Sequence, residues 1–259
     1  MKLNKGHLKI VVKVGSAVLT NSNGNIRKKI IQQIADDIAI VNKNRQLILV
    51  SSGAISMGRK HLDLNKKISI SESQALAAVG QIELMNAWKS AFKKHNINIA
   101  QILLTPKELQ TRKDANNALK TIHTLHSHNT IPIVNENDTT ATDEIQFGDN
   151  DLLAAKLAKL FKADLLILLS IVDGLFESFA KNNHTDKSIL IKKISAINSK
   201  INRMAGEASK LGKGGMISKI EAAKIILKMG SELVITRGDI KHPISKLKHD
   251  SRSTWFSKK

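Results

Sequence analysis

The chain has 259 residues, of which 42% are hydrophobic and 24% are charged, and its formal net charge is +19. This composition is typical of a folded globular protein, and the length suits one large α/β domain or two smaller ones. The absence of cysteine excludes a disulfide scaffold, a thiolate nucleophile and cysteine-based metal sites. No apolar run reaches the roughly 18 residues of a membrane span, and the N-terminus passes directly into a predicted strand. We therefore expect a cytoplasmic protein without a signal peptide.

The basic excess, 41 Lys and Arg against 22 Asp and Glu, has more than one interpretation. A nucleic-acid-binding protein would carry such a charge, but its cations would be clustered and aromatic residues would serve as stacking platforms. Here the lysines are spread along the whole chain and only 3% of the residues are aromatic. The pattern favours solvated lysines on helix surfaces, and an anionic small substrate is a further alternative.

Short apolar runs alternate with segments whose apolar residues recur at helical spacing. The runs predict strands at Leu8–Val14, Gln46–Val50, Ile99–Leu104, Ile131–Val134, Asp164–Leu169 and Leu233–Thr236. The helical spacing predicts helices at Ile26–Val41, Ser73–Phe92, Asn116–His126, Leu152–Phe161, Ser195–Ala205 and Ala222–Met229. This alternation predicts an α/β fold, a three-layer sandwich whose mostly parallel central sheet is covered by helices. A polar hairpin or excursion is expected at residues 175–190, and the basic tail is left without an element.

Polar residues follow the predicted strands where each of them ends. The four loops are 13–16, 51–53, 135–138 and 170–174, and in a parallel sheet they meet at one edge, where such folds bind ligands. Residues 135–151 also hold the densest group of acidic and amide side chains in the chain. This group is either a site or a set of turn formers with a helix N-cap.

Two lysines are the sharpest candidates for phosphate chemistry, which needs backbone N–H donors and cations. Lys13 lies inside an apolar strand, and Lys219 follows the glycine-rich segment 212–215. That segment is not a Walker A loop, because Lys213 is followed by glycine and the spacing from Gly206 is one residue too long. The alternative for either lysine is an ordinary solvated side chain. The histidines of the segment 123–128 are interpreted as helix-end residues, not as zinc ligands.

A set of motifs in collinear order resembles the glutamate 5-kinase family of the amino-acid kinase superfamily. The motifs are KVGSAVLT, VSSGAISMGR, ALAAVGQ, QILLT, IVNENDTTAT, FGDNDLLAA, LLSIVDGLF and GKGGMISKIEAA, and they cover nearly all of residues 9–238. The resemblance implies ATP-dependent phosphorylation of the side-chain carboxylate of L-glutamate, the first step of proline synthesis. It also implies the amino-acid kinase fold, as one domain with a glutamate-binding lobe at about 1–170 and a nucleotide-binding lobe at about 171–259.

The resemblance also implies roles for individual residues. Lys13 and Lys219 would neutralise the transferring phosphoryl group, and Asp151 would orient both lysines. The residues implied to bind glutamate are Ser52, Asp138 and Asn150, with Asn135 and Asp149 nearby. Those implied to contact the nucleotide are Lys13, Ser170, Ile171, Lys213, Gly214, Gly215, Met216, Ile217, Ser218 and Lys219. Magnesium would accompany ATP through its phosphates, without a dedicated protein metal site.

Two departures from the family pattern affect these expectations. Ser170-Ile171 stands where the family usually has Thr-Asp, so a carboxylate that contacts the nucleotide is replaced by an apolar side chain. Many members also carry a C-terminal PUA domain, and we expect a form without it. Inhibition by proline and a homo-oligomer, dimer or tetramer, are further implications of the resemblance. The alternatives are another amino-acid or carbamate kinase of the same fold, or a basic nucleic-acid-binding protein.

Overall fold

Eight of the described strands form one continuous sheet in the computed structural model, which describes residues 8–62, 68–105, 107–140, 150–177, 189–209, 215–249 and 251–258. Within these residues the strand order is β3-β4-β2-β1-β5-β9-β10-β8. The strands are β1 (Lys9–Val14), β2 (Gln46–Ser51), β3 (Asn98–Leu104), β4 (Thr130–Glu136), β5 (Leu165–Ser170), β8 (Lys193–Ile194), β9 (Glu232–Arg237) and β10 (Ser253–Phe256). All pairings from β3 to β9 are parallel, β10 pairs antiparallel with β9, and β8 runs parallel to β10. The prediction of a mostly parallel sheet is confirmed.

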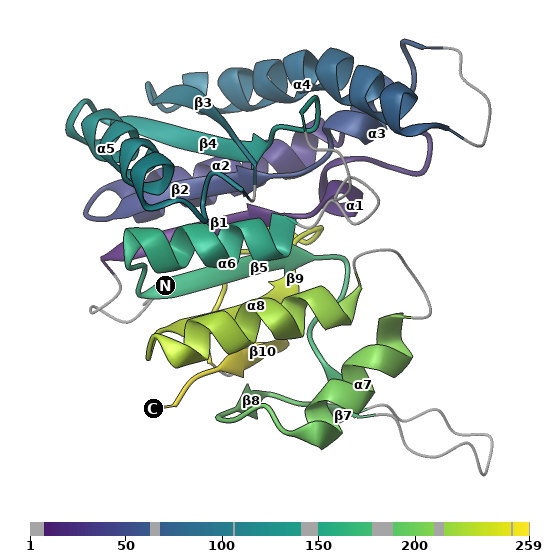
Figure 1. Cartoon of the computed structure of the whole chain (residues 1–259), viewed down its shortest axis with the longest axis vertical. Coiled ribbons are helices and arrows are strands. Elements are labelled where there is room, and N and C mark those ends of the chain that lie inside the picture. The colour runs from purple at the N-terminus through teal and green to yellow at the C-terminus, as the bar shows by residue number, and fades with distance from the viewer. Residues whose placement is uncertain are drawn as a thin grey trace.

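Helices cover both faces of this sheet and complete three layers (Figure 1). One face packs against α1 (Ser16–Leu19), α2 (Lys28–Asn42), α3 (Ala54–Gly58) and α4 (Ile70–Lys93). The opposite face packs against α5 (Arg112–Ser127), α6 (Asn150–Phe161), α7 (Ser199–Ser209) and α8 (Met216–Lys228), and α6 and α8 lie in front of the sheet in Figure 1.

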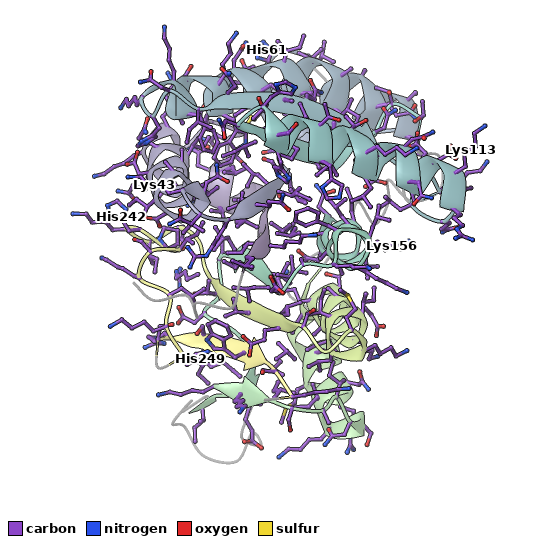
Figure 2. The ribbon with its side chains drawn as sticks, turned by 90° about the vertical axis from the view of Figure 1, so that its left-hand side faces the viewer. Lys43, His61, Lys113, Lys156, His242 and His249 are labelled. Carbon is purple, nitrogen blue, oxygen red and sulfur yellow. The ribbon has the colours of Figure 1, made fainter. Side chains whose placement is uncertain are left out.

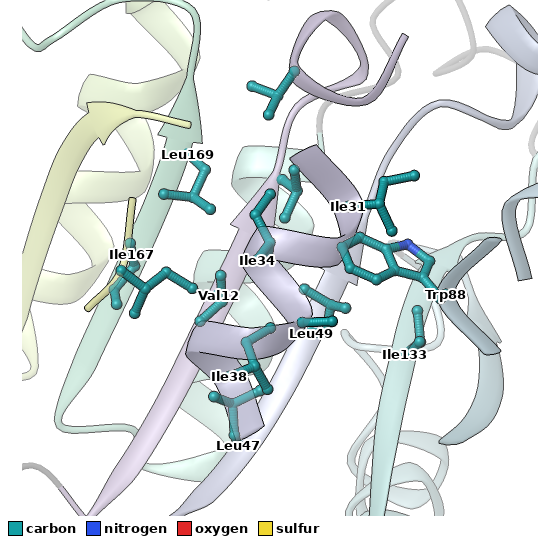
Figure 3. Close-up of a cluster of buried hydrophobic side chains, with 14 of the residues drawn as sticks. Val12, Ile31, Ile34, Ile38, Leu47, Leu49, Trp88, Ile133, Ile167 and Leu169 are labelled. Atoms are coloured by element: carbon teal, nitrogen blue, oxygen red, sulfur yellow. The ribbon is translucent and has the colours of Figure 1, made fainter. Parts of the chain in front are cut away.

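The central strands β1, β2, β4, β5 and β9 read as largely apolar runs because both of their faces are buried, whereas the edge strand β3 is partly exposed. Along β1, Ile10, Val12 and Val14 belong to the core under α2 and α4, whereas Val11 belongs to the core under α6 and α8. Figure 3 shows the first of these cores, in which Val12 faces Ile34 of α2 and Trp88 of α4 lies beside the sheet. Parallel strands with two covered faces leave their carboxyl ends as the natural place for polar side chains.

Several predicted boundaries were wrong, and two short helices were missed. The helix expected at Ser195–Ala205 is α7, which begins at Ser199, and the helix expected from Ala222 is α8, which begins at Met216. The basic tail contains β10, a strand that the sequence pattern does not predict. The polar excursion is confirmed as a hairpin, because β6 (Phe176–Glu177) pairs antiparallel with β7 (Ile189–Leu190). The helices α1 and α3 follow the ends of β1 and β2 directly.

Candidate active site

A cavity of about 640 Å³ opens at the carboxyl ends of β1, β2, β4 and β5. Its lining brings together candidate residues from six separate segments of the chain, namely Lys13, Ser52, Asn135, Asp138, Asn150, Asp151, Ser170, Ile171, Gly215, Met216 and Lys219. The sequence predicts that the loops after these strands meet at one edge of the sheet, and the structure confirms this. From the dense acidic and amide group at residues 135–151, Asn135, Asp138, Asn150 and Asp151 therefore line one cavity, and residues 141–149 lie outside the described residues.

Two lysines contact one buried carboxylate in the lining of this cavity. Lys13 Nζ lies 2.6 Å from Asp151 Oδ1, and Lys219 Nζ lies 2.9 Å from Asp151 Oδ2. Lys13 comes from the penultimate position of β1, while Asp151 and Lys219 come from the first turns of α6 and α8. The lysines are 8% and 9% exposed and Asp151 is 1% exposed, so little water screens their charges. Ser218 Oγ donates a further hydrogen bond of 3.1 Å to Asp151 Oδ2.

The charges of this group determine its protonation state. Burial by itself would raise the pKa of Asp151, but the positive charges of Lys13 and Lys219 outweigh burial and lower the pKa to about 2. Asp151 is thus an anion at every physiological pH, and it holds two ammonium groups close together in the cavity lining. The three charges sum to +1, so this part of the cavity attracts an anion.

Neutral amides and a hydroxyl form the neighbouring wall of the cavity. Asn150 Nδ2 donates to Ser52 Oγ and to Asn135 Oδ1, each at 2.8 Å. Both N–H groups of this amide are therefore used, whereas its buried Oδ1 has no hydrogen-bond partner among the described residues. The next residue after Ser52 is Gly53, whose φ of 114° favours glycine, and it turns the chain from β2 into α3. An unpaired buried acceptor beside a cavity indicates a place for a ligand N–H donor.

Two carboxylates lie near the same wall. Burial raises the pKa of Asp138 to about 6. Glu136, the last residue of β4, also lines the cavity and is 5% exposed. A partly buried carboxylate with a raised pKa is poised to gain from a cationic ligand group, because a nearby positive charge favours its ionised form.

The residues implied to contact a nucleotide are only partly brought together. Ser170, Ile171, Gly215 and Met216 line the cavity, and Ile171 is 46% exposed. Ser218 contacts Asp151, and the side chain of Ile217 is 49% exposed. Three further candidates, Asp149, Lys213 and Gly214, lie outside the described residues.

Three residues near the site were not singled out by the sequence analysis. Arg59, after α3, and Glu136 line the cavity, and Gln81 of α4 accepts a hydrogen bond from Asn135. Arg59 and Gln81 stand in the motifs SGAISMGR and AVGQ, which were noted only as family signatures. Of the helix-end histidines, His126 is away from the cavity lining; its Nε2 lies 2.9 Å from the carbonyl oxygen of Leu47 and its ring packs against Phe161.

The lysines that make the chain basic are distributed over its surface. In Figure 2, Lys43 and Lys113 lie at opposite sides of the view, and Lys156 lies on a third element, α6. Within the described residues, no helix is both long and apolar enough to cross a membrane. The same residues contain no cluster of three or more His, Cys, Asp or Glu side chains able to hold a metal ion.

Comparison with known proteins gives consistent matches. The model of the amino acid kinase family matches residues 9–237. Glutamate 5-kinase of Bradyrhizobium diazoefficiens is 45% identical over 252 residues, which cover 96% of this chain and 67% of that protein. Glutamate 5-kinase of Pelagibacter ubique is also 45% identical, over 250 residues covering 95% of this chain and 67% of that protein.

Solved structures with the same fold are more distant in sequence. UMP kinase from Ureaplasma parvum superposes with a TM-score of 0.61 at 18% identity, covering 97% of this chain and 99% of that one. Carbamate kinase from Giardia lamblia bound to AMP-PNP superposes with a TM-score of 0.60 at 18% identity, covering 92% of this chain and 94% of that one. At this level of identity the likeness establishes the fold.

Proposed function

This chain belongs to the amino acid kinase family, and within it to the glutamate 5-kinases, and we propose that the cavity around Asp151 is where it phosphorylates L-glutamate with ATP. The observation that carries the placement is the clamp of Lys13 and Lys219 on one buried carboxylate. The relatives do not favour a nucleic-acid-binding protein, and the diffuse lysines give that alternative no footprint.

The reaction needs alignment and charge neutralisation more than it needs a base. An oxygen of the glutamate side-chain carboxylate attacks the γ-phosphorus of ATP, the bond from that phosphorus to the β,γ-bridging oxygen breaks, and ADP leaves. The products are glutamyl 5-phosphate and ADP, and no proton changes hands. Both reactants are anions, so Lys13 and Lys219 would lower the cost of bringing them together and would stabilise the transferring phosphoryl group. Asp151 would keep both ammonium groups in place.

The polar wall would bind the amino-acid end of glutamate. Asn150 Oδ1 lacks a partner among the described residues, and an α-ammonium group would supply one. The carboxylate of Asp138 would balance the charge of the same ammonium group. Ser52 and Asn135 would orient Asn150. With the ammonium group held beside Asn150, the side-chain carboxylate of glutamate would extend toward Lys13 and Lys219. Both lysines pair with Asp151, the residue that follows Asn150.

ATP would occupy the other side of the lysines, beside Ser170, Ile171, Gly215 and Met216, so that the two lobes predicted from the family meet at the lysine clamp. Mg²⁺ would be held chiefly by the nucleotide phosphates, because the Asp151 carboxylate is engaged by two lysines and the described residues offer no three-ligand cluster. When bound, the ion would neutralise phosphate charge. Proline inhibition and a homo-oligomer are further proposals, both carried by the family resemblance.

A substrate panel tests the proposed function. Purified protein would be incubated with ATP and magnesium and with L-glutamate, L-aspartate, carbamate or UMP, and ADP formation would be followed by a coupled assay. Hydroxylamine would trap an acyl phosphate as the hydroxamate. We expect ADP and hydroxamate in equal amounts with L-glutamate. ADP formation that does not depend on glutamate, or a preference for another acceptor, would refute the proposal.

A further inference from the structure

Four polar side chains form a continuous chain of hydrogen bonds that runs from α4 to the cavity. Gln81 Oε1 accepts from Asn135 Nδ2 at 2.8 Å. Asn135 Oδ1 in turn accepts from Asn150 Nδ2, which also donates to Ser52 Oγ. Gln81 does not line the cavity, whereas the other three residues do. Gln81 is therefore the outer end of a relay whose inner end faces the substrate.

The orientation of the amide groups in this relay decides whether Asn150 presents a hydrogen-bond acceptor or a donor to the cavity. Because Gln81 offers its oxygen, Asn135 must present its own oxygen to Asn150, and Asn150 must turn its nitrogen inward to the relay. Asn150 Oδ1 is then left as an acceptor that has no partner among the described residues. If Gln81 offered its nitrogen instead, both asparagines would reverse and Asn150 would present a donor. An acceptor suits an ammonium group, whereas a donor would repel it.

The backbone holds Gln81 at this position through an unusually close helix contact. A Cβ atom at Gly80 would lie 1.9 Å from the carbonyl oxygen of Ala54, and one at Gly58 would lie 2.0 Å from that of Leu76. Only the two glycines allow α4 to lie directly on α3, which follows the loop of Ser52. The residue beside Gly80 is thereby brought to the end of β4, where Asn135 lies.

We propose that Gln81 is a positioning residue that sets the hydrogen-bond polarity of the amino-acid subsite and so selects substrates with an α-ammonium group. The proposal rests on the proposed function, since it assigns the amide wall to the α-ammonium end of glutamate. Gln81 acts through Asn135 and Asn150 without contacting the reacting atoms. Its loss should weaken glutamate binding and leave the ATP side unchanged.

Two substitutions of Gln81 separate the effect of its hydrogen-bond acceptor from the effect of its side-chain length. Gln81→Met keeps the length of the side chain but cannot accept the hydrogen bond of Asn135. Gln81→Glu offers acceptors alone, so it permits only the relay direction seen here. Asn86→Leu is the control, because Asn86 is an exposed residue of the same helix. Each variant would be assayed for kcat and for KM toward glutamate and ATP, with glutarate, which lacks the ammonium group, as a competitive inhibitor.

We expect Gln81→Met to raise KM for glutamate on the order of 10-fold. Its kcat and KM for ATP should stay within about 2-fold of wild type, and so should its inhibition constant for glutarate. Gln81→Glu should restore KM for glutamate, and Asn86→Leu should change nothing. An unchanged KM in Gln81→Met, or a parallel loss for glutamate, ATP and glutarate, would overturn the proposal. A wild-type protein without glutamate-dependent activity would instead refute the proposed function.

Discussion

Replacing Asp151 with asparagine tests the electrostatic centre of the site. The change keeps the size of the side chain but removes the anion that lies 2.6 Å from Lys13 Nζ and 2.9 Å from Lys219 Nζ. Two ammonium groups that are less than one-tenth exposed would then face each other without a counter-charge. We expect the lysines to move apart and the cavity to lose the arrangement that receives the phosphoryl group.

The size of the effect on stability follows from the pKa and from the burial. A shift of the Asp151 pKa from 3.8 to about 2 corresponds to a stabilisation of about 2 kcal/mol at neutral pH. Because the folded pKa is the lower one, this stabilisation is present above pH 4 and is lost as the pH falls toward 2. Removing one partner of a buried ion cluster costs about 3–5 kcal/mol. Asp151→Asn should therefore lower the free energy of unfolding by about 2–5 kcal/mol.

The effect on turnover should exceed what lost stability explains. We expect kcat to fall by about 10²–10³, the range for removing a group that supports transition-state charge. Asp37→Asn is the matched control, because Asp37 is also fully buried and accepts hydrogen bonds from the N–H groups of Ile244 and Ser245, far from the cavity lining. Asp37→Asn should lower stability but leave kcat of the folded protein within about 3-fold. Equal losses of kcat in the two variants, measured well below the melting temperature, would refute the reasoning.

Further predictions concern three residues around the cavity, Asp138, Gly80 and Trp88. Because burial raises the pKa of Asp138 to about 6, kcat/KM for glutamate should fall as the pH drops below 6, and Asp138→Asn should abolish that step. The same raised pKa means that ionisation of Asp138 lowers the stability of the folded protein as the pH rises from 4 to 6. Asp138→Asn should therefore unfold no more easily than wild type at pH 7. A lower stability of the variant at pH 7 would contradict the raised pKa of Asp138. Gly80→Ala places a Cβ 1.9 Å from the carbonyl oxygen of Ala54. The substitution should therefore raise KM for glutamate and lower the melting temperature. Wild-type values of both would show that α3 can move away from α4 without affecting glutamate binding or stability. Trp88→Phe removes the 2.9 Å hydrogen bond from Trp88 Nε1 to the buried hydroxyl of Ser51. The free energy of unfolding, measured in urea, should fall by about 1–3 kcal/mol. An unchanged free energy of unfolding would mean that this hydrogen bond does not stabilise the protein.

The sheet was largely predictable from the sequence because its central strands are buried on both faces. Apart from Lys9 and Lys13, the run ending at Val14 is apolar, and a short run of this kind is typical of a strand that is buried on both faces. β10 escaped prediction because it has four residues, Ser253–Phe256, within a basic tail, and its pairing with β9 is a long-range contact. Local patterns do not record partners that lie so far away in the sequence.

Candidate site residues could be recognised from the sequence where the polarity of a side chain differs from that of its neighbours. A lysine inside an apolar strand drew attention to Lys13, and the run of acidic and amide residues drew attention to Asn135 and Asp151. The clamp itself could not be foreseen from spacing, because Asp151 and Lys219 are 68 residues apart, and their roles came from the family resemblance. Gln81 looks like any other helical glutamine, and its partner is 54 residues away. The raised pKa of Asp138 depends on burial, which only the folded chain supplies.

The central claim is that phosphoryl transfer occurs at the lysine clamp, and a single-turnover experiment on Lys219→Ala tests it most directly. Rapid quenching with saturating ATP and glutamate would measure the rate of glutamyl phosphate formation apart from product release. Lys224→Ala is the control, since Lys224 lies on the same helix and pairs with Glu221 at the surface. We predict a rate at least about 100-fold below wild type for Lys219→Ala and an unchanged rate for Lys224→Ala. A near-wild-type rate in a folded Lys219→Ala protein would contradict the claim.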